Sequence, residues 1–562
     1  MSESYDIVVV GAGWYGLAAA RACAHLISNC KIAILERGES CGGTWSKNRL
    51  YPGLRSNNMF NTFEYPDFPM LGAKYNVGSD EHIPGPAIHD YLTDFAKHFD
   101  LLGKIQFNVN VDSAENLGDN GWELAVTGLE GAKRVVTARK LIVATGLTSV
   151  PNMPHYKNAE SFEAPIFHVK DFGKRSRNGD LEGNKNTVVV GGAKSAFDIA
   201  YSMVEAGSTV DIVIRDSGNG PAWMAPSFVT PLKKRLDFLL STRLLTWFSP
   251  CPWGPEDGYS RIRRFLHGTA VGRFIVDSFW KILEGDVTTS NGYDDQPETR
   301  MLKPWNAAFW FGGGLGILNH GKNWFDLVKS GKIRVHIGQV DHLEKRAVLL
   351  ADGTTLSADA IICATGWKKV PSIQLLGGTT KTSGILELDR SPEDLKLLKT
   401  RADNEILASF PRLKDQPKSL SKEPASAPPR LYRFMVPPAK LFQHTIAFVG
   451  FMSTATTGPC AYAQALWVAA YFRENVDRMP RSEDEAIRDT MLHTQWGKWR
   501  HPTGYGASIP DFVFDGVPYM DMLYRDLGLN SHRKKGWMSE LVSPYLPADY
   551  AGLLDEWEAK NL

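Results

Sequence analysis

Short apolar runs that end in glycine and lead into helix-like stretches recur along this chain. Ile7–Val10 has the composition of a buried strand, and the alanine-rich segment after Gly16 has that of a helix. Thr187–Val190 begins a second unit of the same kind. Buried strands that alternate with helices are typical of parallel sheets covered by helices. The pattern therefore predicts an α/β fold.

The first unit carries a glycine motif directly after its strand. Gly11, Gly13 and Gly16 form G-x-G-x-x-G, in which the first glycine permits a tight turn, the second a close approach of backbone to pyrophosphate, and the third close helix packing. The next strand ends at Glu36, where a carboxylate can accept hydrogen bonds from ribose hydroxyls. We expect a dinucleotide site here; a merely tight turn between strand and helix is the alternative.

The second unit differs from the first in one charge. Gly191, Gly192 and Ala193 follow its strand, and the next strand ends in Arg215 where the first unit has Glu36. A guanidinium favours a 2′-phosphate, whereas a carboxylate favours a free 2′-hydroxyl. We therefore expect NADPH in the second site and an ADP-ribose moiety without that phosphate in the first. Arg215 as a solvated charge at a strand end is the alternative.

Both units close in the same way. Each continues through a small β-meander into a strand that ends Ala-Thr-Gly, at Ala144–Gly146 and at Ala364–Gly366. This is an internal repeat of whole domains, and one nucleotide per repeat predicts two dinucleotides, FAD and NADPH. The expected fold is α/β, with two Rossmann-like dinucleotide-binding domains, the second inserted in the first, plus a mostly helical insertion.

The order of these motifs sets the expected domain organisation. The ranges are 1–155 and 371–480 for the FAD-binding domain, 156–220 and 321–370 for the NADPH-binding domain, 221–320 for a helical insertion and candidate substrate lid, and 481–562 for a C-terminal extension.

Composition excludes several other classes. The 63 Lys and Arg nearly cancel the 62 Asp and Glu and are scattered along the chain, so nucleic acid is not an expected partner. The six cysteines show no C-x-x-C pair or metal-ligand spacing, so we expect free thiols, no metal and a cytoplasmic location. No apolar run reaches about 18 residues, so no transmembrane segment is expected. A homo-oligomer is left open.

Three short segments resemble a known family, the class B flavoprotein monooxygenases. The sequence CGGTW at Cys41–Trp45 resembles the G-G-x-W element of the flavin domain, and CATGWKKVP at Cys363–Pro371 is similar to the A-T-G-Y-x-x-x-x-P element of flavin-containing monooxygenases. SFEAPIFHVKDF resembles the family fingerprint, with Phe162 and His168 in register. The resemblance covers residues 1 to about 220 and about 320 to 480.

The fingerprint departs from the family pattern at two positions. Ala164 replaces its glycine and Phe172 its last residue. The family's fingerprint histidine lies in the linker between domains, so the resemblance assigns Phe162 and His168 to linking the two domains. A satisfied structural histidine is the alternative for His168.

The resemblance implies an enzyme that uses FAD, NADPH and O₂ to oxygenate a lipophilic small molecule at nitrogen or sulfur through a flavin 4a-hydroperoxide. The segment YPGLRSNN begins like the Y-P-G-x-R-C-D element of Baeyer-Villiger enzymes, but Asn57 stands where those have aspartate. Oxygen insertion beside a ketone is therefore an alternative, and a non-catalytic flavin- or nucleotide-binding regulator is a third. A disulfide reductase needs a redox-active cysteine pair, and none is spaced for it.

Asn57 is the candidate catalytic residue. The resemblance aligns it with the asparagine that contacts the flavin oxygen adduct. A neutral amide can donate a hydrogen bond to that adduct without protonating it, whereas water and stray protons destroy it. A turn residue without catalytic role is the alternative.

The residues expected to contact the two cofactors are Gly11, Gly13, Gly16, Glu36, Arg37, Gly43, Thr44, Trp45, Ser56, Asn57, Val111, Ala144, Thr145, Gly146, Gly191, Gly192, Ala193, Lys194, Ser195, Asp198, Arg215, Ala364, Thr365, Gly366 and Gln464. Lys194 is expected to steady phosphate, and Ser195 either to donate to phosphate or to cap its helix.

The 221–320 segment has no counterpart in a minimal two-domain pattern. Within it, leucines and aromatic residues of Leu232–Phe248 recur at helical spacing, which predicts a helix over these residues. We expect it to cover the substrate cleft, and a helix lying on a membrane surface is the alternative. Several of the 16 tryptophans fall in this segment and suit either a large apolar pocket or an ordinary core.

Overall fold

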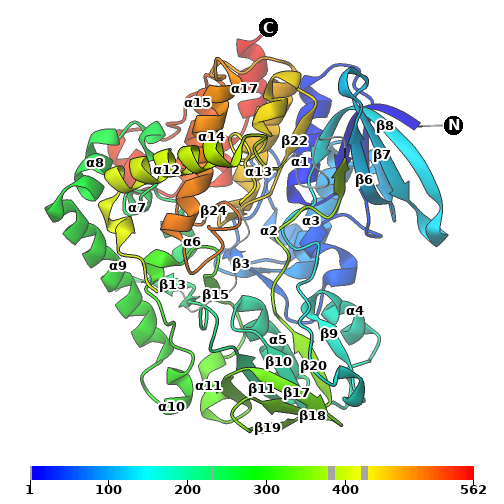
Figure 1. Cartoon of the computed structure of the whole chain (residues 1–562), viewed down its shortest axis with the longest axis vertical. Coiled ribbons are helices and arrows are strands. Elements are labelled where there is room, and N and C mark those ends of the chain that lie inside the picture. Colours follow the sequence, from blue (N-terminus) through cyan, green and yellow to red (C-terminus); the bar gives the residue numbers. More distant parts are fainter. Residues whose placement is uncertain (1–2, 230–231, 377–385, 419–427) are drawn as a thin grey trace.

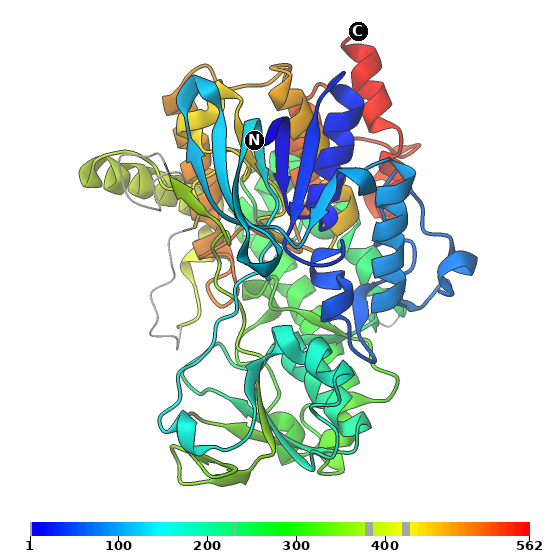
Figure 2. The ribbon, with the colours of Figure 1, turned by 90° about the vertical axis from the view of Figure 1, so that its right-hand side faces the viewer.

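The chain is built around two main sheets, one in the upper and one in the lower half of the molecule as drawn in Figures 1 and 2. The computed structural model describes residues 3–229, 232–376, 386–418 and 428–562. Residues 377–385 and 419–427 of the range expected to complete the FAD-binding domain lie outside the described residues, as do 1–2 and 230–231.

The first sheet has eight strands within the described residues, in the order β21-β6-β7-β8-β1-β2-β5, with β22 also on β8. The strands β22, β8, β1, β2 and β5 run parallel. The bounds are β1 Glu3–Val10, β2 Ile32–Glu36, β5 Ile105–Phe107, β6 Asn110–Asn116, β7 Trp122–Thr127, β8 Lys133–Val143, β21 Gln374–Leu376 and β22 Ile446–Phe448. As expected, β6, β7 and the first half of β8 form an antiparallel meander.

Small side chains let two helices pack tightly behind this sheet. α1 (Trp14–Leu26) buries a row of alanines, and α13 (Thr457–Phe472) is buried from Gly458 to its end. Alanine keeps helix axes close because it adds little volume beyond the backbone. The two helices are neighbours although they are far apart in sequence, which ties the N-terminal segment to the C-terminal half.

The second sheet is entirely parallel, in the order β16-β11-β10-β20-β9. Its elements are β9 Ile166–His168, β10 Asn186–Val190, α5 Lys194–Glu205, β11 Thr209–Ile214, β16 Ile333–Ile337 and β20 Ala360–Cys363. Beside it lies an antiparallel meander of β17 Val340–Glu344, β18 Ala347–Leu350 and β19 Thr355–Ser357. The chain returns to the first sheet at β21, so the second unit is inserted in the first, as expected.

The segment between β11 and β16 is mostly helical, as expected. It contains two short parallel strands, β12 (Met224–Pro226) and β15 (Gly316–Leu318), and the long helix α9. α9 spans Ala270–Asn291, and the other strands and α-helices of the segment are β13 Phe228–Val229, β14 Lys234–Arg235, α6 Leu236–Leu240, α7 Arg243–Thr246, α8 Ser260–Gly268, α10 Pro297–Arg300 and α11 Trp324–Lys329.

One helix prediction in this segment is wrong. The residues Leu232–Phe248 form β14 and two short helices, because α6 ends at Leu240 and Thr242 caps a new helix by accepting a hydrogen bond from the Leu245 N–H. Arg243, within this range, is 0% exposed and is paired with Asp521 and with Glu540. The apolar residues do recur at helical spacing, but the segment is divided into two helices, and buried ion pairs of Arg243 hold the second one in place.

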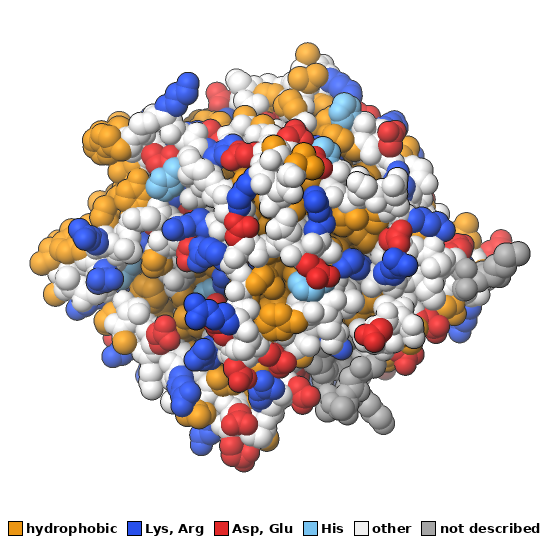
Figure 3. Space-filling model, turned by 90° about the horizontal axis from the view of Figure 1, so that it is seen from above, with side chains coloured by type: hydrophobic (Ala, Val, Ile, Leu, Met, Phe, Trp, Pro, Cys, Tyr) orange, Lys and Arg blue, Asp and Glu red, His pale blue; other side chains and the backbone are white. Residues whose placement is uncertain are grey.

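The C-terminal residues pack against the rest of the chain. α12 (Pro392–Ser409) lies beside α14 (Glu483–Arg500), and α15 (Gly516–Asp526) lies beside α13. On the face seen from above in Figure 3, side chains of both charges are intermixed with apolar ones. Within the described ranges no helix is long and apolar enough to cross a membrane.

Candidate active site

The two glycine loops are built alike at the carboxyl ends of their sheets. Gly11 has a φ of +111°, and a Cβ there would lie 2.6 Å from the carbonyl oxygen of Ala144. Gly191 has a φ of +145°, and its Cβ would collide with the carbonyl of Ala364. The Ala144 N–H donates to the Val10 carbonyl and the Ala364 N–H to the Val190 carbonyl, each at 2.9 Å. The predicted repeat is therefore present at the level of individual backbone contacts.

The first loop faces a second glycine turn. The Gly42 N–H donates to the Ala12 carbonyl at 2.9 Å, and a Cβ on Gly13 would lie 3.6 Å from the Gly43 Cα. Gly43–Trp45 forms a 3-10 turn. The structure thus brings the predicted residues Gly43, Thr44 and Trp45 next to the first loop.

Glu36 lies where the sequence places it, at the end of β2 beside the first loop. Its two carboxylate oxygens accept from the Ala12 and Gly38 N–H groups, each at 2.7 Å. A carboxylate oxygen has a second lone pair, so capacity to accept from a ribose remains. Arg37 follows it and is exposed. Val111 lies in β6 and is buried in the core of the sheet.

The groups around the first loop fit a pyrophosphate-bearing ligand. No side chain caps the N-terminus of α1, so its first N–H groups and its positive dipole end are available to an anion. A Cβ on Gly16 would collide with the Gly11 carbonyl, so only glycine keeps the helix this close to the loop. The Thr145 hydroxyl oxygen is buried and has no hydrogen-bond partner among the described residues.

The second loop leads into a buried ion pair. The Lys194 ammonium group, in the first turn of α5, pairs with Asp198, and His320 contacts the same carboxylate at 2.9 Å. Burial acts to raise the pKa of Asp198, but Lys194 and His320 hold it below its usual value. Ser195 does not cap α5. Lys194 therefore has protein partners as well as a place beside the expected phosphates.

Asn319 connects this ion pair to the strand that carries Asn57. Its Oδ1 accepts from Lys194 Nζ at 2.9 Å, while its Nδ2 donates to the carbonyls of Ser56 at 2.9 Å and Arg55 at 3.2 Å. Arg55–Met59 is β3. Asn319 is only 8% exposed. The second glycine loop and β3 are thus joined by one amide.

His82, in β4 (His82–Pro84), holds the same carbonyl from another direction. Its Nδ1 lies 3.1 Å from the Ser56 oxygen and its Nε2 2.6 Å from Ser227 Oγ. Burial lowers the pKa of His82, so the ring is neutral at pH 7. The backbone before Asn57 is therefore fixed by two side chains from different parts of the chain.

A cavity of about 170 Å³ opens beside β3. Its wall is mainly apolar and comes from β3, from the helical insertion, and from the residues around β23 (Ser453–Thr454) and β24 (Asp511–Phe512). The insertion contributes Trp223, Leu236, Leu240, Trp280 and Leu283, among others. In Figure 1, β3 and β15 lie at a height between the two sheets, and α9 lies to their left.

Asn57 stands in this wall with its amide available. Within the part of the chain that the structure describes, its side chain forms no hydrogen bond. The neighbouring Asn58 is held instead, since its Nδ2 donates to the Ala455 carbonyl at 2.9 Å. Both residues line the cavity, and Asn57 is the one whose amide nitrogen does not already donate to a protein group among the described residues.

His168, the last residue of β9, contacts the segment that follows β20. Its Nε2 donates to the Gly366 carbonyl at 2.9 Å, and its Nδ1 accepts from the Lys170 N–H at 3.1 Å. Burial lowers its pKa, so the neutral ring suits both bonds. Trp367, next to Gly366, forms an isolated β-bridge with Pro151, which lies in the segment between β8 and β9. A part in linking the two units stays a prediction for His168.

Two other predicted residues are enclosed by protein. Phe162 is fully buried in the apolar cluster beneath the β17–β19 meander. Gln464 is buried in α13, where its amide accepts from the Gly450 N–H at 2.9 Å and donates to the Tyr519 hydroxyl at 2.8 Å. Their assignments to domain linkage and cofactor contact stay predictions.

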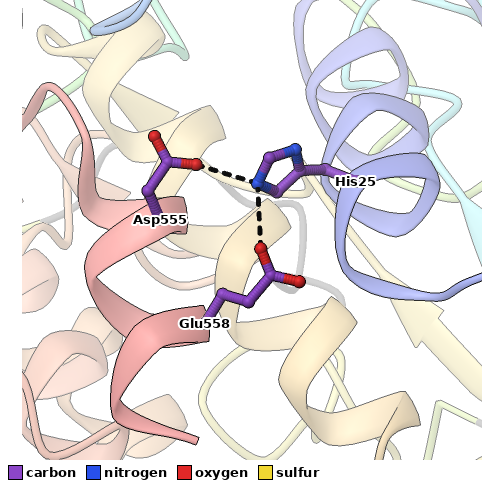
Figure 4. Close-up of side chains that lie close together, drawn as sticks. All are labelled: His25, Asp555 and Glu558. Atoms are coloured by element: carbon purple, nitrogen blue, oxygen red, sulfur yellow. Dashed lines mark ion pairs between the residues drawn. The ribbon is translucent and has the colours of Figure 1, made fainter. Parts of the chain in front are cut away.

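A histidine and two carboxylates meet away from the cavity (Figure 4). His25 Nε2 of α1 lies 2.9 Å from Asp555 and 3.6 Å from Glu558, both in α17 (Leu553–Lys560). Such a trio can bind a cation, but the side chains are exposed to part-exposed and bond one another. Their evident effect is to dock α17 on α1.

Sequence reasoning missed Asn319, Asp237 and Glu284. Asn319 follows a three-residue apolar strand, and the two carboxyls sit among leucines that suggested only a helical face. Each reaches the site through a contact with a residue far away in sequence. No local pattern marks such residues.

Comparisons with known proteins identify the family. The family model described as pyridine nucleotide-disulphide oxidoreductase matches residues 8–240. The FAD-dependent monooxygenase rstn6 of Aspergillus nomiae is 35% identical, over 99% of this chain and 98% of its own length. The FAD-dependent monooxygenase resA of Aspergillus sclerotiorum is 34% identical over the same shares. The chain belongs to the family of fungal FAD-dependent monooxygenases.

Solved monooxygenases share the fold. The closed structure of cyclohexanone monooxygenase is 18% identical, with a TM-score of 0.61 over 94% of this chain and 98% of that one. S-allyl-L-cysteine S-oxygenase from Allium sativum is 16% identical, with a TM-score of 0.52 over 99% and 93%. The expected class B fold with two Rossmann-like units is confirmed.

The expected class of enzyme and its FAD are confirmed by the family. A cyclohexanone monooxygenase of the same fold is bound to NADP⁺, which supports the expected nicotinamide cofactor. All six cysteines are free thiols.

Proposed function

We propose that this protein is an NADPH- and O₂-dependent monooxygenase that oxygenates a lipophilic small molecule at nitrogen or sulfur. The observation that carries the proposal is the free amide of Asn57 in the wall of a mainly apolar cavity. Apolar walls favour a lipophilic ligand and exclude water, whereas a few placed polar groups orient it.

The two glycine loops assign a cofactor to each sheet. FAD is held by Gly11, Gly13 and Gly16 with Glu36, and NADPH by the loop at Gly191 with Arg215 on its 2′-phosphate. We assign residues 1–155 and 371–480 to the FAD-binding domain and residues 156–220 and 321–370 to the NADPH-binding domain. The bound pair supplies the electrons and the O₂ activation that put one oxygen atom on the substrate and release the other as water.

Asn57 has the role of a neutral donor at the reacting end of the cavity. An amide N–H stabilises developing negative charge on oxygen without giving up a proton. The clamp of Asn319 and His82 on the Ser56 carbonyl keeps the Asn57 backbone in place. Preorganised donors are effective because they need no rearrangement during the reaction.

The insertion at 221–320 acts as the cover of the substrate cavity. Trp223 and Leu236 line the cavity, and Trp280 and Leu283 place α9 along its side. These contacts support a lid rather than a helix that faces a membrane.

Three probes with labelled dioxygen test the proposal. Purified protein with NADPH and ¹⁸O₂ is given methyl phenyl sulfide, N,N-dimethylaniline or cyclohexanone, and products are identified by mass spectrometry. We expect one ¹⁸O in the sulfoxide or N-oxide. A labelled lactone alone establishes Baeyer-Villiger chemistry instead, and a yellow protein that never oxidises NADPH establishes a non-catalytic binder.

A further inference from the structure

The cavity wall holds two carboxyl groups, and they have different surroundings. The carboxylate of Asp237 is fully occupied, since it accepts from Arg235 at 2.9 and 3.1 Å, from the Met59 N–H at 3.0 Å and from Thr62 at 2.8 Å. Burial acts to raise its pKa, but Arg235 and these donors hold it below its usual value. Asp237 is an ionised structural group that ties α6 to β3.

Glu284 is different because no cation pairs with it among the described residues. It lies on α9, on the helix face that also presents Trp280, Leu283 and Val287 to the cavity. Its Oε1 accepts from the Ala308 N–H at 2.7 Å. Burial raises its pKa, against the lowering effect of the backbone N–H groups of Ala308 and Phe309.

This arrangement leaves acceptor capacity on one carboxyl inside a mainly apolar cavity. An acceptor in such surroundings costs free energy unless a donor meets it. Oε1 accepts from the Ala308 N–H, but a carboxylate has about four acceptor positions, so acceptor capacity remains on this carboxyl of a residue that lines the cavity. A ligand that fills the apolar space and carries a donor completes the site.

Asn57 and Glu284 reach the cavity from different elements. Asn57 comes from β3 and Glu284 from α9. One ligand that touches both is therefore oriented by two polar contacts in an apolar space, which is how most small-molecule sites obtain specificity.

We propose that Glu284 is the recognition group for a hydroxyl or N–H donor on the lipophilic substrate, and that it turns the atom to be oxygenated toward Asn57. This inference rests on the proposed function and names the class of its substrate: an apolar molecule with a hydrogen-bond donor as well as an oxidisable nitrogen or sulfur.

A matched pair of sulfides tests the inference. Methyl phenyl sulfide and 4-(methylthio)phenol differ only by a hydroxyl, and kcat/KM for sulfoxide formation is measured for both with FAD-loaded enzyme. The variant Glu284→Gln keeps an oxygen for the Ala308 N–H but turns an NH₂ group toward the cavity. We expect it to lower kcat/KM about tenfold for the phenol and to change that for the parent sulfide less than about twofold.

Asp286→Asn is the control, because Asp286 lies on the same helix and does not line the cavity. Thermal unfolding of each variant checks the fold. Equal losses for both sulfides in Glu284→Gln would show that Glu284 only holds the Ala308 turn, which overturns the inference.

Calorimetric binding of the same two sulfides separates the inference from the proposed function. If neither sulfide is oxygenated but the phenol binds about tenfold more weakly to Glu284→Gln than to the natural chain, the proposed function fails and the recognition site stands. Equal binding of the phenol by both chains overturns the recognition site, whatever the turnover.

Discussion

The side-chain amide of Asn319 lies between the ammonium group of Lys194 and the backbone carbonyl of Ser56, with 2.9 Å to each. Lys194 begins the helix after the second glycine loop, and Ser56 precedes Asn57. The position of the second glycine loop is thereby tied to that of the candidate catalytic amide through the side chain of Asn319.

The variant Asn319→Asp tests this tie. Aspartate keeps an oxygen for Lys194 but replaces the NH₂ group that donates to the Arg55 and Ser56 carbonyls with a second oxygen. A lost buried hydrogen bond costs about 1–3 kcal/mol, so we expect β3 to shift and oxygen to be lost as hydrogen peroxide. The ratio of product to NADPH consumed should fall several-fold while the rate of flavin reduction stays within about twofold.

Asn323→Asp is the matched control for this prediction. Asn323 caps α11 (Trp324–Lys329), because its Oδ1 accepts from the Phe325 N–H, and aspartate retains that oxygen. Its side chain makes no hydrogen bond to β3 among the described residues. A normal product ratio in Asn319→Asp would show that the amide does not position Asn57.

Arg215 should decide between the two nicotinamide cofactors. A charge-assisted bond to a 2′-phosphate is worth about 1.5–3 kcal/mol, so Arg215→Ala should weaken NADPH by roughly 10- to 150-fold and leave NADH nearly unchanged. Dissociation constants for both nucleotides give the answer. Equal weakening of the two would remove Arg215 from the 2′-phosphate.

Substitutions at two glycines of the first loop should impair the protein for different physical reasons. Gly16→Ala places a Cβ against the Gly11 carbonyl and should prevent stable folding. Gly13→Val begins from a Cβ with ordinary contacts, 3.6 Å from the nearest atom, so the protein should fold but purify without yellow colour. Thermal unfolding and absorbance near 450 nm separate the two outcomes. Full FAD content in Gly13→Val would place the pyrophosphate elsewhere.

Asp511 should make stability depend on pH. It is fully buried, and burial raises its pKa from 3.8 to about 6. A carboxyl with a raised folded-state pKa binds its proton more tightly when folded, so this contribution is complete below about pH 4 and is lost as pH rises through about 6. The shift corresponds to about 3 kcal/mol.

Asp511→Asn should remove that part of the pH dependence, since an amide does not titrate. Urea unfolding between pH 4 and 7 measures the difference, with Asp119→Asn as the control because Asp119 is exposed. An unchanged slope in Asp511→Asn would mean that Asp511 is not protonated more readily in the folded chain.

The sequence could predict what is local. Strand, glycine turn and helix lie next to one another at Val10–Gly16, so their pattern indicates the fold and the cofactor loops directly. It could not predict that Arg243 is buried, because its partner Asp521 is far along the chain. The same holds for Glu284, which meets the cavity of Asn57 only once α9 has packed across from β3.

The central claim is that Asn57 directs oxygen onto the substrate, and the yield of product per NADPH in Asn57→Ala tests it most directly. Losing one preorganised donor costs about 3 kcal/mol, so sulfoxide formation from methyl phenyl sulfide should fall roughly a hundredfold. NADPH consumption should continue, because reduction does not use this amide, and hydrogen peroxide should account for it. A sulfoxide yield per NADPH equal to that of the natural chain would contradict the account and leave Asn57 as a turn residue.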